Sequence, residues 1–514
     1  MNKITRRQFI ATAGGALTAT TLSAAFGASG ASERRFNILW LMTDQHNHGV
    51  MGCAGHPVVR TPNLDRLASQ GARFTHATCV TPFCSPTRAS FVTGVYPHTH
   101  GIVKNLNKAE EGKGIVGDCL CTENLLRRQG YLTRFLGKWH LGRITDLDCY
   151  ADQETDVPYP QAYSDFLKAA GQKAKAEGPR PGEVAASRCF MTPEMAAFHA
   201  VWKDDKHRSK QDVSIIGRSA RKAEYAPESW LADRCVELIE ERQDENFMVA
   251  LSLGPPHALW VCPDSYYDMY DPKQVWFPPS ANDHPAVYRN TQSARLGQMG
   301  EANLREYLRC YLGLVTMVDA LFGRVLEALD RLGLAQNTLV LFTADHGDMQ
   351  GAHGMADKSI SGYYEEILRV PLLMRYPGHV PPGSVIGSAA SSVDLMPTLL
   401  DFAGLPIPAG RQGHSLRSVL EGREKREFDA AYCERGLGND KRFSRMVRTA
   451  EAKYAWFGDG RAELFALKDD PYELRNVADD RSYSALRKEL HSMLIRQAGK
   501  TNDPALQPLV SAAV

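Results

Sequence analysis

The chain has 514 residues, of which 43% are hydrophobic and 23% are charged, an ordinary composition for a globular protein. Its formal net charge of +1 argues against a strongly basic nucleic-acid binder. A chain of 514 residues is too long for one simple core, so we expect one large domain and a smaller one.

The first 31 residues have the composition of an export signal. Arg6 and Arg7 precede an apolar stretch that runs to about Phe26, and small residues follow through Ala31. The stretch is too interrupted to remain in a bilayer, so we predict a twin-arginine-type signal peptide over residues 1–31 and no stable membrane span. This interpretation places the protein in the periplasm or outside the cell. It also predicts that the protein interacts with the twin-arginine export machinery, which carries folded proteins.

Three short apolar runs predict buried strands, and each is followed by polar side chains of the kind that bind ligands. In chain order they are Phe36–Met42, followed by Asp44 and Gln45; Phe247–Leu253, followed by His257; and Thr338–Phe342, followed by Asp345 and His346. Apolar residues at helical spacing cover Leu64–Ala68 and Leu304–Leu332. Alternating strands and helices favour a three-layer α/β domain with a site at the carboxyl edge of a mainly parallel sheet.

Two segments depart from this alternation. Residues 143–225 have few periodic apolar positions and many charges, so we interpret them as an insertion over the site. From Leu416 on, short runs predict antiparallel strands at Met446–Thr449, Lys453–Phe457 and Glu463–Leu467, and an amphipathic helix over about Tyr483–Gln497. We therefore expect a large domain over residues 33–415 and a small α+β domain over residues 416–514.

A cysteine stands directly before a pattern that starts helices. Ser85 can cap a helix and Pro86 suits the first helical position, so Cys84 is expected beside a helix N-terminus, which favours negative charge. Arg88, one turn further on, points back toward the same place. Two interpretations follow: a buried structural cysteine on a capped turn, or a nucleophile in an anion-binding nest.

The run Cys84-Ser85-Pro86-Thr87-Arg88 resembles the Cys/Ser-x-Pro-x-Arg signature of the sulfatase family, in which the cysteine is oxidised to Cα-formylglycine. Residues Gly137-Lys138-Trp139-His140-Leu141-Gly142 resemble a second sulfatase signature, and the resemblance extends from about Asn37 to Asp479. It implies the fold of the alkaline phosphatase superfamily: a large mixed sheet between helices, then a small C-terminal domain with a four-stranded antiparallel sheet and a helix. It also implies sulfate-ester hydrolysis and a formylglycine-generating (sulfatase-maturating) enzyme as a partner.

Asp44, Gln45, Asp345 and His346 follow strands that are far apart in the sequence. Oxygen ligands from two loops together with one imidazole suit a hard divalent cation. The resemblance implies that these residues and the modified Cys84 hold Ca²⁺, and one imidazole would also tolerate Mn²⁺. Many sulfatases have Asp in place of Gln45, and Asn or Gln in place of His346. The combination in this chain resembles the branch with phosphonate monoester and phosphodiester hydrolases, which is the alternative activity.

The resemblance also implies roles for the polar residues around the cysteine. Arg88 and Lys138 would hold the modified residue and the sulfate, and Lys358 would complete the cationic cradle. His257, with Lys358, would protonate the departing alcohol, and His140 would accept the proton that triggers sulfate release. Lys138, His257 and Lys358 are thus the expected substrate-binding residues. Asp348 is expected to be a helix N-cap, and Glu365 and Glu366 are expected to pair with Arg369 or Arg375.

The export signal favours a carbohydrate sulfate as the substrate. The insertion carries a local excess of basic residues, which either steers an anionic polysaccharide or forms a solvated loop: Lys203, Lys206, Arg208, Lys210, Arg218, Arg221 and Lys222. Three aromatic residues near His257 either stack on a sugar ring or pack in the core: Trp260, Tyr266 and Tyr267.

Overall fold

The structure is a computed structural model, and it describes residues 36–106, 121–142, 158–186, 188–203, 214–358, 362–424, 430–437 and 443–512. The expected signal peptide lies outside the described residues, and so do Lys206, Arg208 and Lys210. From Phe36 onward the chain forms one compact unit, and its division into two domains near residue 416 stays a prediction. None of the helices in the described ranges combines the length and the apolarity needed to cross a membrane.

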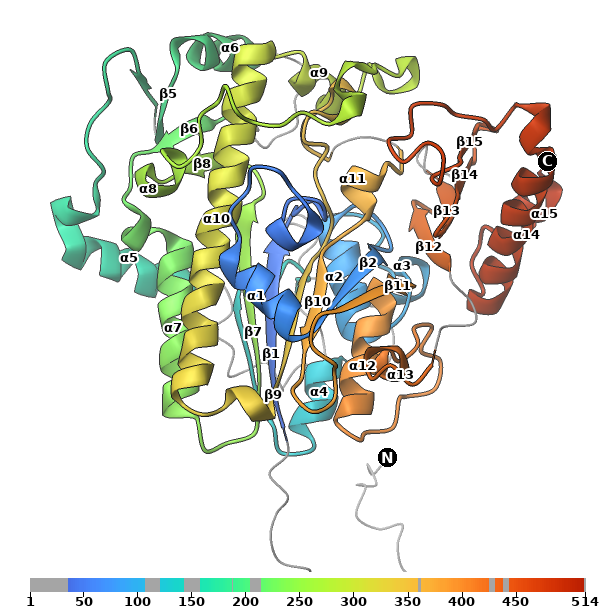
Figure 1. Ribbon diagram of the computed structural model, residues 1–514, viewed down its shortest axis with the longest axis horizontal. Helices are drawn as coiled ribbons and strands as arrows, with labels where there is room; N and C mark the ends of the chain where they lie inside the picture. Colours follow the sequence, from blue (N-terminus) through green and yellow to red (C-terminus); the bar gives the residue numbers. More distant parts are fainter. Residues whose placement is uncertain are drawn as a thin grey trace, which may run out of the picture. The chain divides into compact units, whose positions relative to one another are not determined.

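A seven-stranded mixed sheet forms the centre of the fold, in the order β11-β2-β10-β9-β1-β7-β3 (Figure 1). Strands β3, β7, β1 and β9 run parallel, β10 is antiparallel to β9 and β2, and β11 is parallel to β2. Their bounds are β1 Asn37–Asp44, β2 Ala72–Thr78, β3 Leu132–Gly137, β7 Phe247–Pro256, β9 Thr338–Ala344, β10 Leu372–Arg375 and β11 Ser384–Ser391. The three predicted strands are β1, β7 and β9, which are neighbours, so their carboxyl ends meet at one edge.

Helices cover both faces of this sheet, which confirms the expected three-layer fold (Figure 1). The side chains of β1 alternate between two apolar clusters, as the pleat of a strand requires. Leu39 and Leu41 pack in the cluster that contains residues of α1, α7 and α10, whereas Trp40 packs in the cluster that contains residues of α2, α4 and α12. The helix bounds are α1 Pro62–Gln70, α7 Pro227–Glu241 and α10 Glu301–Arg331 on one face, and α2 Cys84–Thr93, α4 Thr122–Arg127 and α12 Leu395–Phe402 on the other.

Further helices occur elsewhere in the described part of the chain. Their bounds are α3 Pro97–His100, α5 Pro158–Ala170, α6 Pro193–Lys203, α8 Asp264–Tyr267, α9 Gln292–Gly297, α11 Glu365–Leu368 and α13 Arg417–Leu420. α11 contacts both the loop after β9 and the C-terminal sheet. On one side, Gly347 N of the loop donates to Ile367 O at 3.0 Å. On the other side, Glu365 pairs with Arg448 of the C-terminal sheet at 2.7 Å.

The C-terminal sheet is antiparallel, in the order β12-β13-β14-β15. The strands are β12 Ala430–Arg435, β13 Ser444–Thr449, β14 Lys453–Phe457 and β15 Ala462–Phe465, and the helices α14 Ser484–Thr501 and α15 Leu506–Ser511 follow them. Leu490 and Leu494 of α14 pack on Val447 and Tyr454 of the sheet. The small antiparallel α+β unit is therefore confirmed, with one strand, β12, that the sequence analysis missed.

The insertion forms part of a second small sheet, in the order β4-β5-β6-β8. Its strands are β4 Val184–Ala185, β5 Cys189–Met191, β6 Ile216–Ser219 and β8 Trp260–Cys262, and β6 runs parallel to β8. Arg218 of β6 is buried and donates to Glu183 and Asp264. This arginine is therefore a structural residue of the insertion, and it does not belong to a solvated or substrate-steering surface.

Candidate active site

Cys84 is the first residue of α2 and is fully buried. The expected cap differs in detail, because Phe83 occupies the N-cap position and makes no side-chain bond to the helix. Asn105 supplies the missing acceptor: its Oδ1 accepts from Ser85 N at 3.1 Å, while Ser85 Oγ accepts from Leu106 N at 3.1 Å. The loop at Asn105 thus holds the start of α2, and with it Cys84, against the end of the sheet.

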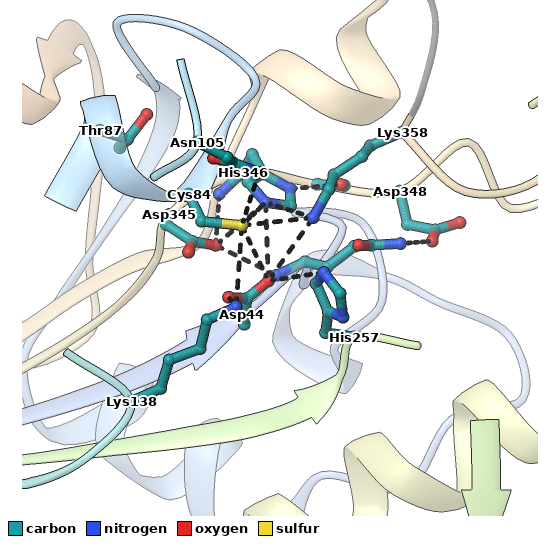
Figure 2. Close-up of polar contacts among 12 residues, drawn as sticks. Asp44, Cys84, Thr87, Asn105, Lys138, His257, Asp345, His346, Asp348 and Lys358 are labelled. Atoms are coloured by element: carbon teal, nitrogen blue, oxygen red, sulfur yellow. Dashed lines mark hydrogen bonds and ion pairs between the residues drawn. The ribbon is translucent and has the colours of Figure 1, made fainter. Parts of the chain in front are cut away.

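Cationic and metal-binding side chains surround the Cys84 sulfur (Figure 2). Its Sγ lies 3.3 Å from Lys358 Nζ, 3.2 Å from His346 Nε2 and 3.8 Å from Lys138 Nζ. Burial alone would raise the pKa of this thiol, but Lys138, Lys358 and His346 hold it well below the ordinary value. The position therefore stabilises negative charge, as an anion-binding nest must.

Four of the predicted metal-binding residues converge on one point: Asp44, Cys84, Asp345 and His346 each offer a ligand atom, and these atoms lie within 4.8 Å of one another. All four residues are buried. Burial and Cys84 both oppose ionisation of Asp44, yet Lys138, His257 and Lys358 hold its pKa below the usual value. Two carboxylates and one imidazole at this spacing fit a divalent cation.

Gln45 is the fifth predicted metal-binding residue, and its amide is oriented by two carboxylates. Its Nε2 donates to Asp348 Oδ2 at 2.5 Å and to Asp357 Oδ1 at 2.9 Å. Its Oε1 is buried and has no hydrogen-bond partner among the described residues. A buried carbonyl oxygen without a partner is costly, so the unpaired Oε1 also fits a cation site.

Arg88 lies beside the two metal-site carboxylates. Its Nε donates to Asp345 Oδ2 at 2.7 Å, and its Nη2 lies 3.3 Å from Asp44 Oδ2. Its Nη1 donates to Lys138 O at 2.5 Å and to Ser252 Oγ at 2.9 Å. These bonds give Arg88 a positioning role toward Asp44 and Asp345, and its predicted contact with the sulfate stays a prediction.

The two predicted catalytic histidines are held in fixed orientations. His257 Nδ1 lies 2.7 Å from Ala258 O and so donates to it, which leaves Nε2 facing the site, 3.8 Å from Asp44 Oδ1. His140 Nε2 lies 3.1 Å from Leu106 O, and its Nδ1 is buried without a hydrogen-bond partner in the described part of the chain. Each ring therefore keeps one nitrogen available for proton transfer.

The aromatic residues near His257 belong mainly to the core. Trp260 is fully buried, and its Nε1 donates to Pro256 O at 2.9 Å. Tyr267 is buried, and its hydroxyl donates to Glu306 at 2.5 Å. Packing is therefore the correct alternative for these two side chains, and Tyr266 is half-buried.

Some residues of the site were not predicted, or were predicted in another role. Asn105 and Ser252 lie in no motif. Asp348 was expected to be a helix N-cap, but its carboxylate is buried and accepts hydrogen bonds from Gln45 and Tyr307. Asp357 was not predicted as a residue of the site either. Its position next to the predicted residue Lys358 was the one sequence feature that could have pointed to it. Glu365 does lie near Arg369, at 3.5 Å, but its strongest partner is Arg448, while Arg375 donates to Gln70 instead.

Comparison with known proteins supports the resemblance to the sulfatase family over most of the chain. Residues 36–405 match the sulfatase family, and residues 351–500 match the C-terminal region of N-sulphoglucosamine sulphohydrolase. The ulvan-active sulfatase of Formosa agariphila is 28% identical over 91% of this chain and 82% of its own length. The N-acetylglucosamine-6-O-sulfatase of Bacteroides thetaiotaomicron is 26% identical over 95% of this chain and 91% of its own length.

The solved structures include a phosphonate monoester hydrolase from Silicibacter pomeroyi, which is 25% identical, with a TM-score of 0.74, over 92% of this chain and 97% of its own. The superfamily fold is thus shared with the alternative activity. The family match, which spans most of the described residues, and the curated relatives favour the sulfatase assignment. The chain therefore belongs to the sulfatase family, and it is a sulfuric ester hydrolase.

Proposed function

We propose that this protein hydrolyses a carbohydrate sulfate ester to an alcohol and inorganic sulfate, through a Cα-formylglycine made from Cys84. The observation that carries the proposal is the position of the Cys84 side chain. Two lysines face it, with Lys358 Nζ at 3.3 Å and Lys138 Nζ at 3.8 Å, and the cation-binding carboxylate of Asp44 lies 3.7 Å away. Such a cradle stabilises the negative charge of a sulfate group near a nucleophile.

As an aldehyde hydrate, the modified residue would supply a hydroxyl nucleophile and a second hydroxyl for sulfate release, which a thiol lacks. Lys138 and Lys358 would bind the sulfate oxygens, because their ammonium groups already face this position. Arg88 would act through Asp44 and Asp345, whose carboxylates it holds. Orientation of these groups before substrate arrives is what makes them effective.

Ca²⁺ is the cation that we propose for the cluster, with Mn²⁺ as the alternative that an imidazole would tolerate. Asp44, Gln45, Asp345 and His346 would hold it together with the modified Cys84. A bound cation would supply positive charge beside the nucleophile. The unpaired Oε1 of Gln45 and the carboxylates of Asp44 and Asp345 support this assignment.

The two histidines would divide the proton transfers between them. His257 would protonate the leaving alcohol, assisted by Lys358, because its Nε2 faces the site while Nδ1 is engaged with Ala258 O. His140 would accept the proton that is lost during sulfate release, because its buried Nδ1 has no other partner among the described residues. Each role uses the one ring nitrogen that remains available.

A carbohydrate sulfate is the proposed substrate because two relatives that align with at least 91% of this chain are a sulfatase named for ulvan and an N-acetylglucosamine-6-O-sulfatase. The expected export of the chain supports the same class, because sulfated polysaccharides are met outside the cytoplasm. Under this proposal a formylglycine-generating enzyme acts first, and the twin-arginine machinery then exports the protein. Replacing Arg6 and Arg7 by Lys should retain the protein in the cytoplasm, as cell fractionation would show.

The test is parallel measurement of inorganic sulfate and phosphate released by protein whose Cys84 conversion has been verified by mass spectrometry. The panel contains N-acetylglucosamine 6-sulfate, sulfated oligosaccharides, an aryl sulfate and an aryl phosphonate monoester. We expect sulfate release to dominate. Faster phosphonate cleavage would instead place the chain in the branch that Gln45 and His346 resemble.

Two cysteine variants make the measurement specific. Cys84→Ala should abolish turnover while leaving the fold intact. Cys235→Ala is the matched control, because Cys235 is also fully buried but belongs to α7 and packs in an apolar cluster. Equal turnover in Cys84→Ala and wild-type protein would rule out the proposed nucleophile.

A further inference from the structure

A cavity of about 1180 Å³ adjoins the loop that carries His257. Pro255, Ala258 and Leu259 form part of its wall, and they flank His257 in the sequence. Leu314 and Met317 of α10 line it as well. The His257 loop therefore takes part both in the cavity wall and in the catalytic site, where His257 Nε2 lies 3.8 Å from Asp44 Oδ1.

Three basic residues of the insertion line this cavity: Lys175, Arg188 and Arg221. Backbone contacts hold them near one another. Lys175 lies opposite Arg221 in an antiparallel bridge, and Arg188 O accepts from Ala220 N at 3.0 Å. Glu228 is the one acidic residue of the lining, so positive charge exceeds negative charge there.

Two of the three cations of this cavity have no carboxylate partner within the described part of the chain, and the third, Arg221, interacts electrostatically with Glu228. Lys175 and Arg188 are exposed and make no side-chain ion pair with a described residue, and Arg221 donates to the hydroxyl of Tyr163 at 2.7 Å. Arg218, in the same small sheet, pairs with two carboxylates. Lys175 and Arg221 lie opposite each other in an isolated bridge, where like charges repel, so an anion bound between them would relieve this repulsion.

We propose that this cavity is a subsite for a second anionic group, a sulfate or a carboxylate, on the part of the substrate that leaves with the alcohol. The inference rests on the proposed function, in which His257 faces the leaving group. The body of the alcohol would then extend past His257 toward Ala258 and Leu259, into the cavity. Leu167, Ile215 and Val261 provide apolar surface for the faces of sugar rings. The substrate is thus a glycan with at least one anionic group besides the scissile sulfate.

The first test compares three disaccharides that share one scissile sulfate: a neutral second sugar, a second sugar with a sulfate, and a second sugar with a carboxylate. We expect the double variant Lys175→Gln/Arg188→Gln to lower the kcat/KM ratio of a dianionic over the monoanionic substrate by at least tenfold. The disaccharide with the larger ratio identifies the anion. Lys173→Gln is the matched control, because Lys173 is exposed in the short helix Gly171–Ala174, directly before Lys175, but does not line the cavity.

The second test does not depend on turnover. Calorimetric titration of Cys84→Ala protein with the same disaccharides should show tighter binding of a dianionic one, and the double variant should remove the difference. An unchanged ratio, or an equal loss on all three disaccharides, would overturn the subsite. Failure of the wild-type protein to release sulfate from any sulfated sugar of the panel or from the aryl sulfate would count against the proposed function instead, while the titration would still decide the subsite.

Discussion

Gln45 donates a hydrogen bond from its side-chain amide nitrogen to the carboxylate of Asp348 at 2.5 Å. The same nitrogen lies 2.9 Å from Asp357 Oδ1, and Tyr307 donates its hydroxyl to the other oxygen of Asp348. Carboxylates accept hydrogen bonds, so the amide nitrogen must face them and Oε1 must face away. Asp348 and Asp357 together therefore determine that Gln45 presents an oxygen, the atom that a hard cation requires.

Replacing Asp348 by Ala should weaken divalent-cation binding about 10-fold, the lower end of the usual range for such outer partners, because the Gln45 amide would lose one of the two carboxylates that orient it. Calorimetric titration of metal-free protein with Ca²⁺ measures the effect directly. Asp348→Asn keeps an acceptor oxygen and should lose less. Equal affinities for wild-type and Asp348→Ala protein would show that the orientation of Gln45 does not depend on Asp348.

Replacing Arg88 by Met should destabilise the metal-free protein by about 3–5 kcal/mol, because Asp44 and Asp345 would be left as buried charges without their shared partner. Urea denaturation gives the free energy of unfolding. Arg88→Lys should be intermediate, since an ammonium group keeps the charge but cannot reach all four acceptors. A Met variant as stable as wild type would contradict the positioning role.

His98 should make the protein more stable at acidic than at alkaline pH. Its Nδ1 lies 2.6 Å from Glu434 Oε2 and its Nε2 lies 3.0 Å from Thr501 O, so both ring nitrogens face acceptors. Burial opposes the charge, but Glu434 and Asp503 raise the pKa of His98 above its ordinary value. The stabilisation is therefore complete below the unfolded-state pKa of about 6.5 and is lost as pH rises through the folded-state value.

The measurement is the unfolding free energy of wild-type and His98→Gln protein, from below the unfolded-state pKa of about 6.5 to above the folded-state pKa of His98. The variant should be less stable by about 2 kcal/mol at the acidic end, the size of a charge-assisted hydrogen bond. The difference in unfolding free energy between the two proteins should narrow as pH increases. A gap that widens with pH would mean that His98 is neutral in the folded protein.

Glu365→Gln should destabilise the protein by about 3–5 kcal/mol in chemical denaturation. Burial disfavours the carboxylate, yet Arg448, Lys453 and Arg369 hold the pKa of Glu365 well below its usual range. Removing the negative charge of Glu365 would leave these three cations without their shared carboxylate partner. Glu366→Gln is the matched control: burial raises the pKa of Glu366, and one of its oxygens has no hydrogen-bond partner among the described residues, so the neutral variant should cost little.

The sequence predicted those parts of the site that depend on local pattern. Asp44, His257 and Asp345 each follow an apolar run, and parallel strands bring their carboxyl ends together. Asp348 was assigned the wrong role because its partner Gln45 lies 303 positions away, and no local pattern reports such a contact. Asn105 was missed for the same reason, since its bond to Ser85 depends on how a loop folds back.

Two other features of the fold were not predicted because they involve buried charged residues. Strand β12 was not predicted because Glu434 and Arg435 interrupt its apolar alternation, although both are buried and paired in the structure. Arg218 was counted with the surface cations of the insertion because Glu183 and Asp264, which neutralise it, lie in other segments. In both cases partners far away in the sequence make charged residues compatible with the interior. Glu434 and Arg218 have ion-pair partners, and Arg435 donates to the carbonyl of Gly362.

Under the proposed chemistry, the complete burial of Cys84 would also set the order of events during biosynthesis. A maturation enzyme must hold the peptide segment around the cysteine in its own active site, and in the folded chain this segment is the first turn of α2, a helix whose residues are all buried. A small sulfate ester needs only the side chain of residue 84, whereas another enzyme needs the whole segment. Under the proposed chemistry, oxidation therefore precedes folding, and folding in turn precedes transport across the membrane. Under this proposal, a chain that folds with its thiol intact would stay inactive, so the supply of maturation enzyme during synthesis would limit the yield of active protein.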